Sequence, residues 1–329
     1  MLDSGVPADA ALEPVVRPPR IALSAAEPVG PAARNALKTG LEALRFYEPA
    51  AAAGEVEAIH QFRVANRRLR AAVELFAAVL HGSRLNVFRR ELPWLGATAG
   101  ATRECDVTEQ LIRDRAARLD PSSQEALGPI FENLSAIRRE EHGKVAAMFA
   151  SKRYRLLLDR IATAPMRKLP PAVAVREMAP AMLRPLARSV IRAGSKLDPG
   201  CPPEALHRLR IRTKRLRYAL EMTGELGGKR VRKAVQRLTA MQDLLGLHND
   251  AVVAIAWLRN FAGNSSAPPA TLLAAGALVH SIHRRQNKLA ARSLKRWKKL
   301  ERDGIIGAAL AEVARNSRPQ DQPPAVSAA

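Results

Sequence analysis

The sequence has 329 residues, of which 47% are hydrophobic, so it is long enough for two domains or one large one with a substantial core. Its 53 Lys and Arg residues outnumber the 31 Asp and Glu residues, and the net charge of +22 predicts a polyanionic partner: nucleic acid, an anionic membrane or a phosphate polymer. Aromatic residues make up only 4%, which disfavours the single-strand nucleic-acid binders that stack bases on aromatic side chains.

The two ends of the chain differ in composition from the rest. Residues 1–29 are rich in Pro and Ala without helical periodicity, so we expect a flexible arm there, and we expect a disordered tail over 316–329. Between them, apolar residues recur at helical spacing and no strand alternation is evident. Long helices are predicted over 31–53, 55–80, 84–118, 123–150, 173–197, 202–225, 229–261 and 268–314, with a short one at 153–163.

Turn signals separate these predicted helices. They include Asp198-Pro199-Gly200 and a loop from Asn260 to Pro269. Four long helices in each half predict an all-α fold of two antiparallel four-helix bundles. We expect the first bundle over 30–165 and the second over 172–315.

One stretch of the sequence occurs twice. Glu57 to Arg70 reads E-A-I-H-Q-F-R-V-A-N-R-R-L-R, and Glu204 to Arg217 reads E-A-L-H-R-L-R-I-R-T-K-R-L-R. Half of the aligned positions are identical, and most of the others conserve size or charge. This similarity predicts that the chain consists of two copies of one unit.

Each copy of this stretch is an amphipathic helix with a cationic row. At about 100° per residue, one face carries a His and its basic neighbours, and an apolar stripe that includes Leu69 or Leu216 lies elsewhere on the helix. The rows consist of His60, Arg63, Arg67 and Arg70 in the first copy and His207, Arg210, Lys214 and Arg217 in the second. Arg68 and Arg215 lie together on the other flank of the His.

Such a row has two interpretations. A charged face is commonly just solvated surface. However, four like charges on one face destabilise a helix, and the same residues recur at the same phase in both copies with almost no acid among them. We therefore favour anion binding, for which Arg is well suited because its planar guanidinium donates to phosphate oxygens in pairs.

The paired motifs resemble the signature of the CHAD domain family, the conserved histidine α-helical domain. Trp94 to Val107 is similar to a family segment that ends in Arg-Asp-x-Asp-Val, with Glu104 in place of the first Asp, and Met241 to Val252 resembles its counterpart in the second half. Ser151 to Tyr154 is also similar to a family motif. The resemblance covers roughly residues 30–314.

This resemblance implies two four-helix bundles with pseudo-twofold symmetry, a basic groove or pore between them, and binding of inorganic polyphosphate, often at polyphosphate granules. It implies that the binding residues are His60, Arg63, Arg67, Arg68, Arg70, His207, Arg210, Lys214, Arg215 and Arg217. A Glu-x-Glu-x-Lys strand, typical of the CYTH enzyme domain that often precedes CHAD, does not occur, so we expect a stand-alone binding protein rather than an enzyme.

Other charged residues form weaker patterns. A basic stripe on the last predicted helix adds Arg284, Lys288 and Lys295 as a secondary set of polyphosphate-binding candidates, and Arg138, which lies 146 residues before Arg284, joins this set through the repeat. His280 and His283 lie three apart without nearby carboxylates, and zinc needs three or four ligands, so no metal site or cofactor is expected. Asp106, Asp243 and Asp250 are expected to pair with Arg residues.

The predicted function is therefore polyphosphate binding, and the alternative is a nucleoid-type protein that binds nucleic acid through the same basic surface. Cys105 and Cys201 form no Cys-x-x-Cys motif, no secretory signal is evident, and no apolar run reaches the roughly 18 residues needed to span a membrane. A cytoplasmic location, with or without granules, is expected. The sequence does not specify the oligomeric state or the preferred chain length of the polymer.

Overall fold

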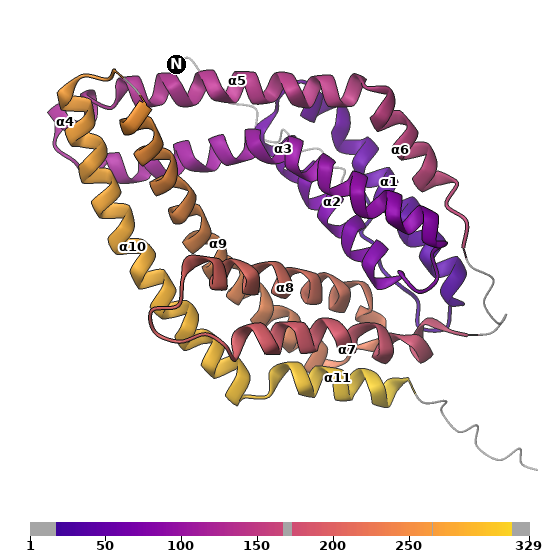
Figure 1. The fold of residues 1–329 in the computed structure, drawn as a ribbon. Helices are drawn as coiled ribbons and strands as arrows, with labels where there is room; N and C mark the ends of the chain where they lie inside the picture. Colours follow the sequence, from indigo (N-terminus) through magenta and orange to yellow (C-terminus); the bar gives the residue numbers. More distant parts are fainter. Residues whose placement is uncertain (1–17, 167–172, 265, 318–329) are drawn as a thin grey trace, which may run out of the picture.

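A computed structural model describes residues 18–166, 173–264 and 266–317. In this part of the chain the regular elements are helices, and the only extended pairings are two isolated bridges, Pro28 with Ala174 and Leu80 with Met166. The all-α prediction is therefore confirmed (Figure 1). None of the described helices is long and apolar enough to cross a membrane.

The first half contains four long helices and two short ones. Tyr154 is buried, and its hydroxyl donates to a carboxylate oxygen of Glu48 at 2.8 Å, which ties the last helix of this half to the first. Ser151 separates two of these helices, because its extended backbone ends one helix and its hydroxyl accepts a hydrogen bond from the Tyr154 amide. The elements are α1 (Val29–Ala52), α2 (Val56–Leu75), α3 (Gly82–Ala116), α4 (Pro121–Glu125), α5 (Gly128–Ala150) and α6 (Lys152–Ala162).

The second half is also helical. Its elements are α7 (Val175–Gly194), α8 (Pro203–Met222), the short 3-10 helix η1 (Gly224–Leu226), α9 (Lys229–Asn264), α10 (Pro269–Arg302) and α11 (Ile305–Asn316). The single helix predicted over 268–314 is wrong, because Gly304 adopts a left-handed φ of 58° and separates α10 from α11. The loop predicted from Asn260 is also too long at its start, since α9 continues to Asn264.

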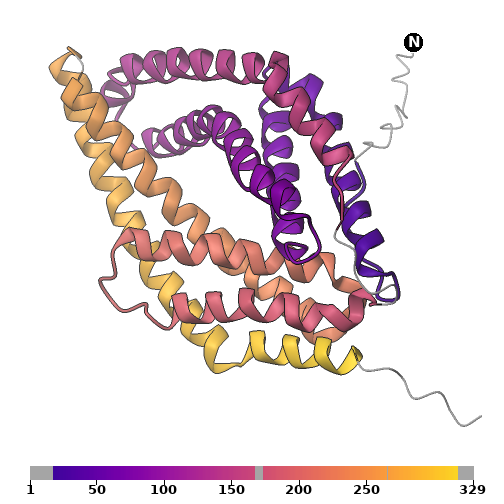
Figure 2. The same cartoon turned by 45° about the vertical axis from the view of Figure 1, so that its right-hand side comes forward.

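The helices form two long hairpins that meet at their tips. α3 packs on α5, and α9 packs on α10. Figures 1 and 2 show these hairpins extending away from the α1–α2 and α7–α8 pairs and converging near α4, where α10 contacts α3, α4 and α5. In addition, α2 contacts α8, and α3 contacts α9. The two halves therefore touch along the repeated helices and again at the hairpin tips.

The buried apolar residues form three clusters rather than the two that separate bundles would imply. One lies within the first half and includes Phe62 and Leu69. Another centres on the second half and includes Leu216, but it also takes in Phe76 from the end of the α2 region. A third joins the hairpin tips, where Ile112 of α3 and others from the first half pack with residues of α9 and α10. Two of the clusters contain residues from both halves of the chain. Burial of apolar surface therefore stabilises the association of the two halves.

Part of the predicted flexible arm packs on the second half. Ile21 and Leu23 are buried, and the amide of Leu23 donates to the carbonyl of Met222 at 2.9 Å. The amide of Ala25 donates to a carboxylate oxygen of Glu225 at 3.2 Å. Residues 1–17 of the arm, and most of the tail predicted over 316–329, lie outside the described residues.

Candidate functional site

Both copies of the repeated stretch lie on helices that face each other. The first lies on α2 and the second on α8, and these two helices are in contact. Leu69 and Leu216 are fully buried and belong to different apolar clusters. Their burial fixes the rotation of each helix, so that the cationic row of each copy lies beside its apolar stripe rather than within it.

Four cations from these rows come together between the two halves. They are Arg63 and Arg67 of α2 and Arg210 and Lys214 of α8, which we call the central cationic cluster. The charges of Arg210, Arg67 and Arg63 each lower the pKa of Lys214, and Arg67 also lowers the pKa of Arg63 and Arg210. The structure thus places the two predicted rows within electrostatic reach of each other.

The central cationic cluster is desolvated. Burial, followed by the neighbouring Arg charges, lowers the pKa of Lys214 to about 6. Burial is also the main reason that the pKa of Arg63 falls to about 10 and that the pKa of Arg210 is lowered. Both effects disfavour the charged form, and both are relieved when an anion takes up a position among these groups.

Glycines allow two of the three arginines of the cluster, Arg63 and Arg210, to approach neighbouring helices. Arg63 donates from Nη1 to the carbonyl of Gly96 on α3 at 2.8 Å. The same guanidinium lies so close to Gly100 that a Cβ there would be 2.4 Å from Nη1. In the second half, Arg210 lies over Gly246 of α9 with more room, since a Cβ there would be 3.8 Å from Nε.

Several donors in the cluster have no protein partner. Among the described residues, the buried Nε groups of Arg67 and Arg210 make no hydrogen bond. A buried donor without a partner costs about 1–3 kcal/mol, and more when it is charged. Asp250 of α9 offsets part of the charge, since its carboxylate raises the pKa of both Arg210 and Lys214, while burial raises its own pKa. The cluster therefore presents unused donors to a bound anion.

A cavity of about 360 Å³ adjoins the cluster. It lies between α2, α3, α7 and α8, and its walls include apolar side chains such as Phe88 and Leu186. Glu74 also lines it, but this carboxylate is bound by Arg89 at 2.8 Å. The predicted binding residues that line it are Arg67, Arg70, Lys214 and Arg215.

The two predicted histidines occupy different environments. His60 is half-buried, and burial together with the charge of Arg103 lowers its pKa. His207 is exposed, and its Nδ1 lies 2.5 Å from Oδ1 of Asn249 on α9. Neither lines the 360 Å³ cavity. The fall in the pKa of His60 means that its ring is less readily protonated in the empty site than an exposed histidine.

Two predicted arginines lie outside both the central cationic cluster and the lining of the 360 Å³ cavity. Arg68 lies near Arg20 of the packed N-terminal segment, and burial, followed by the charge of Arg20, lowers its pKa. Arg217 is buried, donates from Nε to the Gln242 side chain at 2.9 Å, and forms an ion pair with Glu221. Its contacts within the protein make Arg217 a structural residue in this state.

The residues of the secondary set of polyphosphate-binding candidates lie in different environments. Arg138 is held by Asp106 at 2.6 Å and by the carbonyl of Gly54, so the expected pairing of Asp106 with an arginine is present. Arg284 and Lys288 are exposed on α10. Lys295 lines a separate cavity next to α10, outside the central cationic cluster.

Sequence reasoning missed Arg103 of α3 as a neighbour of the site. Its charge lowers the pKa of His60 and Arg63 and that of Asp250, so it lies near all three. A signal was available in the spacing of Gly96, Gly100 and Arg103, since small residues one turn apart mark a helix face that another group approaches. The described residues contain no group of three or more His, Cys, Asp or Glu placed to hold a metal ion.

Comparison with known proteins adds the family. The model of the CHAD domain matches residues 35–259, which include both copies of the repeated stretch. The chain belongs to the CHAD family. A crystal structure of the CHAD domain from the plant Ricinus communis superposes on this CHAD chain with a TM-score of 0.70 and 28% sequence identity, covering 86% of this chain and 97% of that one.

Other similar proteins share the fold or part of the sequence. PptA from Streptomyces chartreusis has a TM-score of 0.66 at 20% identity, with 83% of this chain and all of that chain covered, which shows a common fold. Uncharacterized proteins from two strains of Mycobacterium tuberculosis are 29% identical over 247 residues, or 69% of this chain. The CHAD chain spans 45% of the length of those two relatives.

Proposed function

We propose that this protein binds inorganic polyphosphate between its two halves, through the central cationic cluster and the adjoining cavity. The observation that carries the proposal is the gathering of four half-buried basic side chains, with the Nε donors of Arg67 and Arg210 unpartnered among the described residues. This arrangement is unfavourable in the empty protein and becomes favourable when phosphate oxygens accept from these groups.

The dimensions of the site favour a thin, flexible anion. The adjoining cavity holds about 360 Å³, and its cations come from helices of both halves. A single chain of phosphates can pass its oxygens across Arg67, Arg70, Lys214 and Arg215 in succession. A nucleic-acid duplex is rigid and wider, so it would reach the exposed rim rather than the buried donors. We therefore place nucleic acid second as a ligand.

We propose further that the chain acts as a binding protein, and that it associates with polyphosphate granules in the cell. Guanidinium groups stay protonated at any physiological pH and orient phosphate oxygens through paired donors. Because the ligand is a polyelectrolyte, its affinity should fall with the logarithm of salt concentration, as counterions are released on binding. Each cation removed from the contact should reduce the slope of log affinity against log salt concentration by roughly 0.7, the value for single strands.

Substitution of Arg210 tests the site directly. R210Q removes one positive charge from the cluster. R208Q removes one positive charge from an exposed position two residues earlier on the same helix. Loss of charged hydrogen bonds worth about 1.5–3 kcal/mol predicts at least tenfold weaker binding of long-chain polyphosphate for R210Q. R208Q should bind within about twofold of wild type, and the double variant R63Q/R210Q should lose more than R210Q.

A competition assay separates the candidate functions. Long-chain polyphosphate, duplex DNA and single-stranded RNA are titrated against the full chain at several salt concentrations, including a physiological one. Preference for either nucleic acid at physiological salt, or equal losses for R210Q and R208Q, would reject the proposed site. Release of orthophosphate from polyphosphate in the presence of Mg²⁺ would show that the protein is an enzyme.

A further inference from the structure

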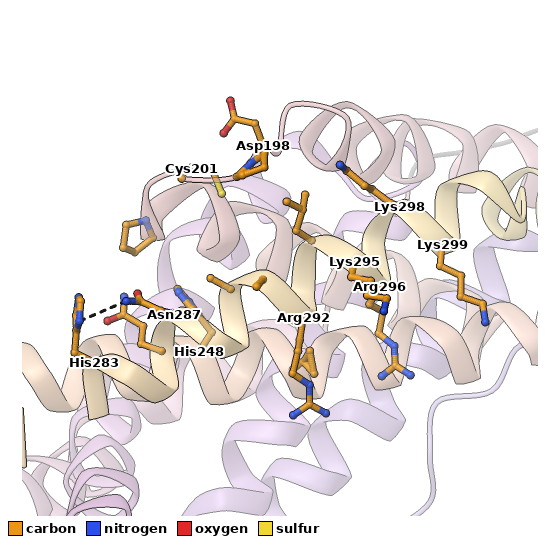
Figure 3. A pocket seen from close by; sticks show the side chains of 18 of the residues that line it. Asp198, Cys201, His248, His283, Asn287, Arg292, Lys295, Arg296, Lys298 and Lys299 are labelled. Atoms are coloured by element: carbon orange, nitrogen blue, oxygen red, sulfur yellow. Dashed lines mark hydrogen bonds between the residues drawn. The ribbon is translucent and has the colours of Figure 1, made fainter. Parts of the chain in front are cut away.

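A second, larger cavity lies on the outside of the second half. It has a volume of about 1460 Å³ and is bounded by the loop between α7 and α8, by α9 and by α10. Figure 3 shows it from close by. It shares no lining residue with the 360 Å³ cavity beside the central cationic cluster. We call it the outer groove, and the proposed polyphosphate site does not account for it.

One end of the outer groove is strongly cationic. Lys295, Lys298 and Lys299 are exposed on α10, and none of them forms an ion pair within the described part of the chain. In Figure 3, Lys298 extends toward the loop that carries Asp198, while Arg292 and Arg296 extend to the opposite side of α10. This end therefore offers several free ammonium groups, which bind phosphate as mobile point charges.

The other end is largely apolar and ends in neutral polar groups. Leu244 of α9, Pro203 of α8 and Ala290 of α10 form its walls. Beside them lies His248, which is only 2% exposed and makes no hydrogen bond to any described residue. Burial lowers the pKa of His248, so its imidazole is neutral near pH 7 and can both donate and accept. His248 therefore supplies a neutral polar group at this end of the groove.

Amide and carboxylate groups complete this end. Gln286 and Asn287 of α10 line the groove, as does Asp198 of the α7–α8 loop. The carboxylate of Asp198 would repel a polyphosphate chain that ran the whole length of the groove. It can instead accept hydrogen bonds from hydroxyl or amino groups. The groove is thus suited to a ligand with an anionic end and a neutral, flat, polar-edged end.

We propose that the outer groove binds a nucleoside triphosphate, with its triphosphate on Lys295 and Lys298 and its base at the apolar end beside His248. Asn287 and Lys298 are separated by about 16 Å along α10, at 1.5 Å per residue, which is a span suited to one extended ligand. The base stacks on the apolar wall, and its edge forms hydrogen bonds with the His248 imidazole and the nearby amides. Asp198 accepts from the sugar hydroxyls.

The test measures binding of a fluorescent nucleoside triphosphate to the full chain and to two matched variants. K295E/K298E reverses two charges inside the groove, and R284E/K288E reverses two exposed charges on the same helix outside it. We expect at least tenfold weaker binding for K295E/K298E and a change within about threefold for R284E/K288E. Absence of saturable binding up to about 1 mM, or equal effects of the two variants, would overturn the proposal.

Two further measurements distinguish this site from the central cationic cluster and test the base. Inorganic tripolyphosphate should displace the fluorescent nucleotide at least tenfold less effectively than the unlabelled nucleoside triphosphate, because it lacks the base. R63Q/R210Q should retain nucleotide binding. Equal displacement by tripolyphosphate, or loss of nucleotide binding in R63Q/R210Q, would overturn the assignment, and neither result would bear on polyphosphate binding itself.

Cys201 provides a direct reading of occupancy. It lines the outer groove and is partly exposed, whereas Cys105, the other cysteine, is buried in the first half. The nucleoside triphosphate should slow labelling of Cys201 by a small thiol reagent in wild type and not in K295E/K298E. Labelling that is unaffected by saturating nucleotide would show that the nucleotide lies elsewhere.

Discussion

The helices α2 and α8 carry the same motif, yet their basic side chains make different contacts. At equivalent positions, Arg63 and Arg210 both enter the central cationic cluster, as do Arg67 and Lys214. Further along, Arg70 lines the 360 Å³ cavity, whereas its counterpart Arg217 is bound to Gln242 and Glu221. The motif therefore determines the position of each basic residue on its helix. The contacts made with the neighbouring helix determine whether its side chain is available to a ligand.

The histidines differ in the same way. His60 is half-buried beside Arg103, while His207 is exposed and paired with Asn249. The first-half copy lies against a tighter neighbour, since Gly100 leaves no space for a side chain next to Arg63. The second-half copy has more room beside Gly246. The two walls of the site are thus similar in charge and unequal in packing, and this inequality can be tested.

The largest expected difference concerns stability. R217Q should lower the free energy of unfolding by about 2 kcal/mol, because it removes hydrogen bonds from a charged, buried side chain to Gln242 and Glu221. R70Q should change it by no more than about 0.5 kcal/mol, since Arg70 makes no hydrogen bond or ion pair with another described residue. Urea unfolding measures both. Equal destabilisation by the two variants would contradict the structural role assigned to Arg217.

The next difference concerns pH and rests on Lys214. Its pKa of about 6 in the folded, empty protein lies below its ordinary value of 10.5, so the unfolded chain binds a proton that the folded chain does not. The groups that face it are Arg210 on α8, Arg67 and Arg63 on α2, and Asp250 on α9. The empty protein therefore loses stability as the pH falls from about 10 to 6, and K214M should be more stable than wild type at pH 7.

Polyphosphate should reverse this effect. A bound anion raises the pKa of Lys214, so binding takes up a proton near neutral pH, and affinity should strengthen as the pH falls from 8 to 6 by up to about tenfold per pH unit. Titration calorimetry in buffers of different ionisation enthalpy measures the proton uptake. K214M serves as the control for titration of His60 and of the polymer ends. The same pH slope in wild type and K214M would show that Lys214 stays protonated in the empty site.

The smallest expected difference concerns the two glycines. G100A places a methyl group 2.4 Å from the present position of Arg63 Nη1, so the guanidinium must move and its bond to Gly96 weakens. We expect about fivefold weaker polyphosphate binding, equivalent to loss of about 1 kcal/mol of hydrogen bonding. G246A leaves 3.8 Å to Arg210 Nε and should bind as wild type does.

Thermal stability controls this comparison. Both substitutions replace a helical glycine by alanine, which favours each helix by up to about 1 kcal/mol. Neither variant should therefore melt below wild type. If G100A and G246A bind polyphosphate equally well, the packing of Arg63 against Gly100 and that of Arg210 against Gly246 are equivalent for binding.

Several features of this protein follow from the amino-acid sequence alone. Apolar periodicity predicts the helices, and the repeated stretch predicts two equivalent helices whose cations share a phase with His60 and His207. The burial of Leu69 and Leu216 confirms the predicted rotation of α2 and α8. These predictions succeed because the angle between two side chains on one helix depends only on their separation in sequence.

Only the tertiary structure decides which of these cations meet. The joining of Arg63 with Arg210, the capture of Arg217 by Gln242 and the outer groove beside His248 all depend on contacts between helices that are far apart in the chain. Distances of this kind depend on the packing of many side chains at once. Periodicity therefore predicts the direction in which a cation leaves its helix, while packing across helices determines what it reaches.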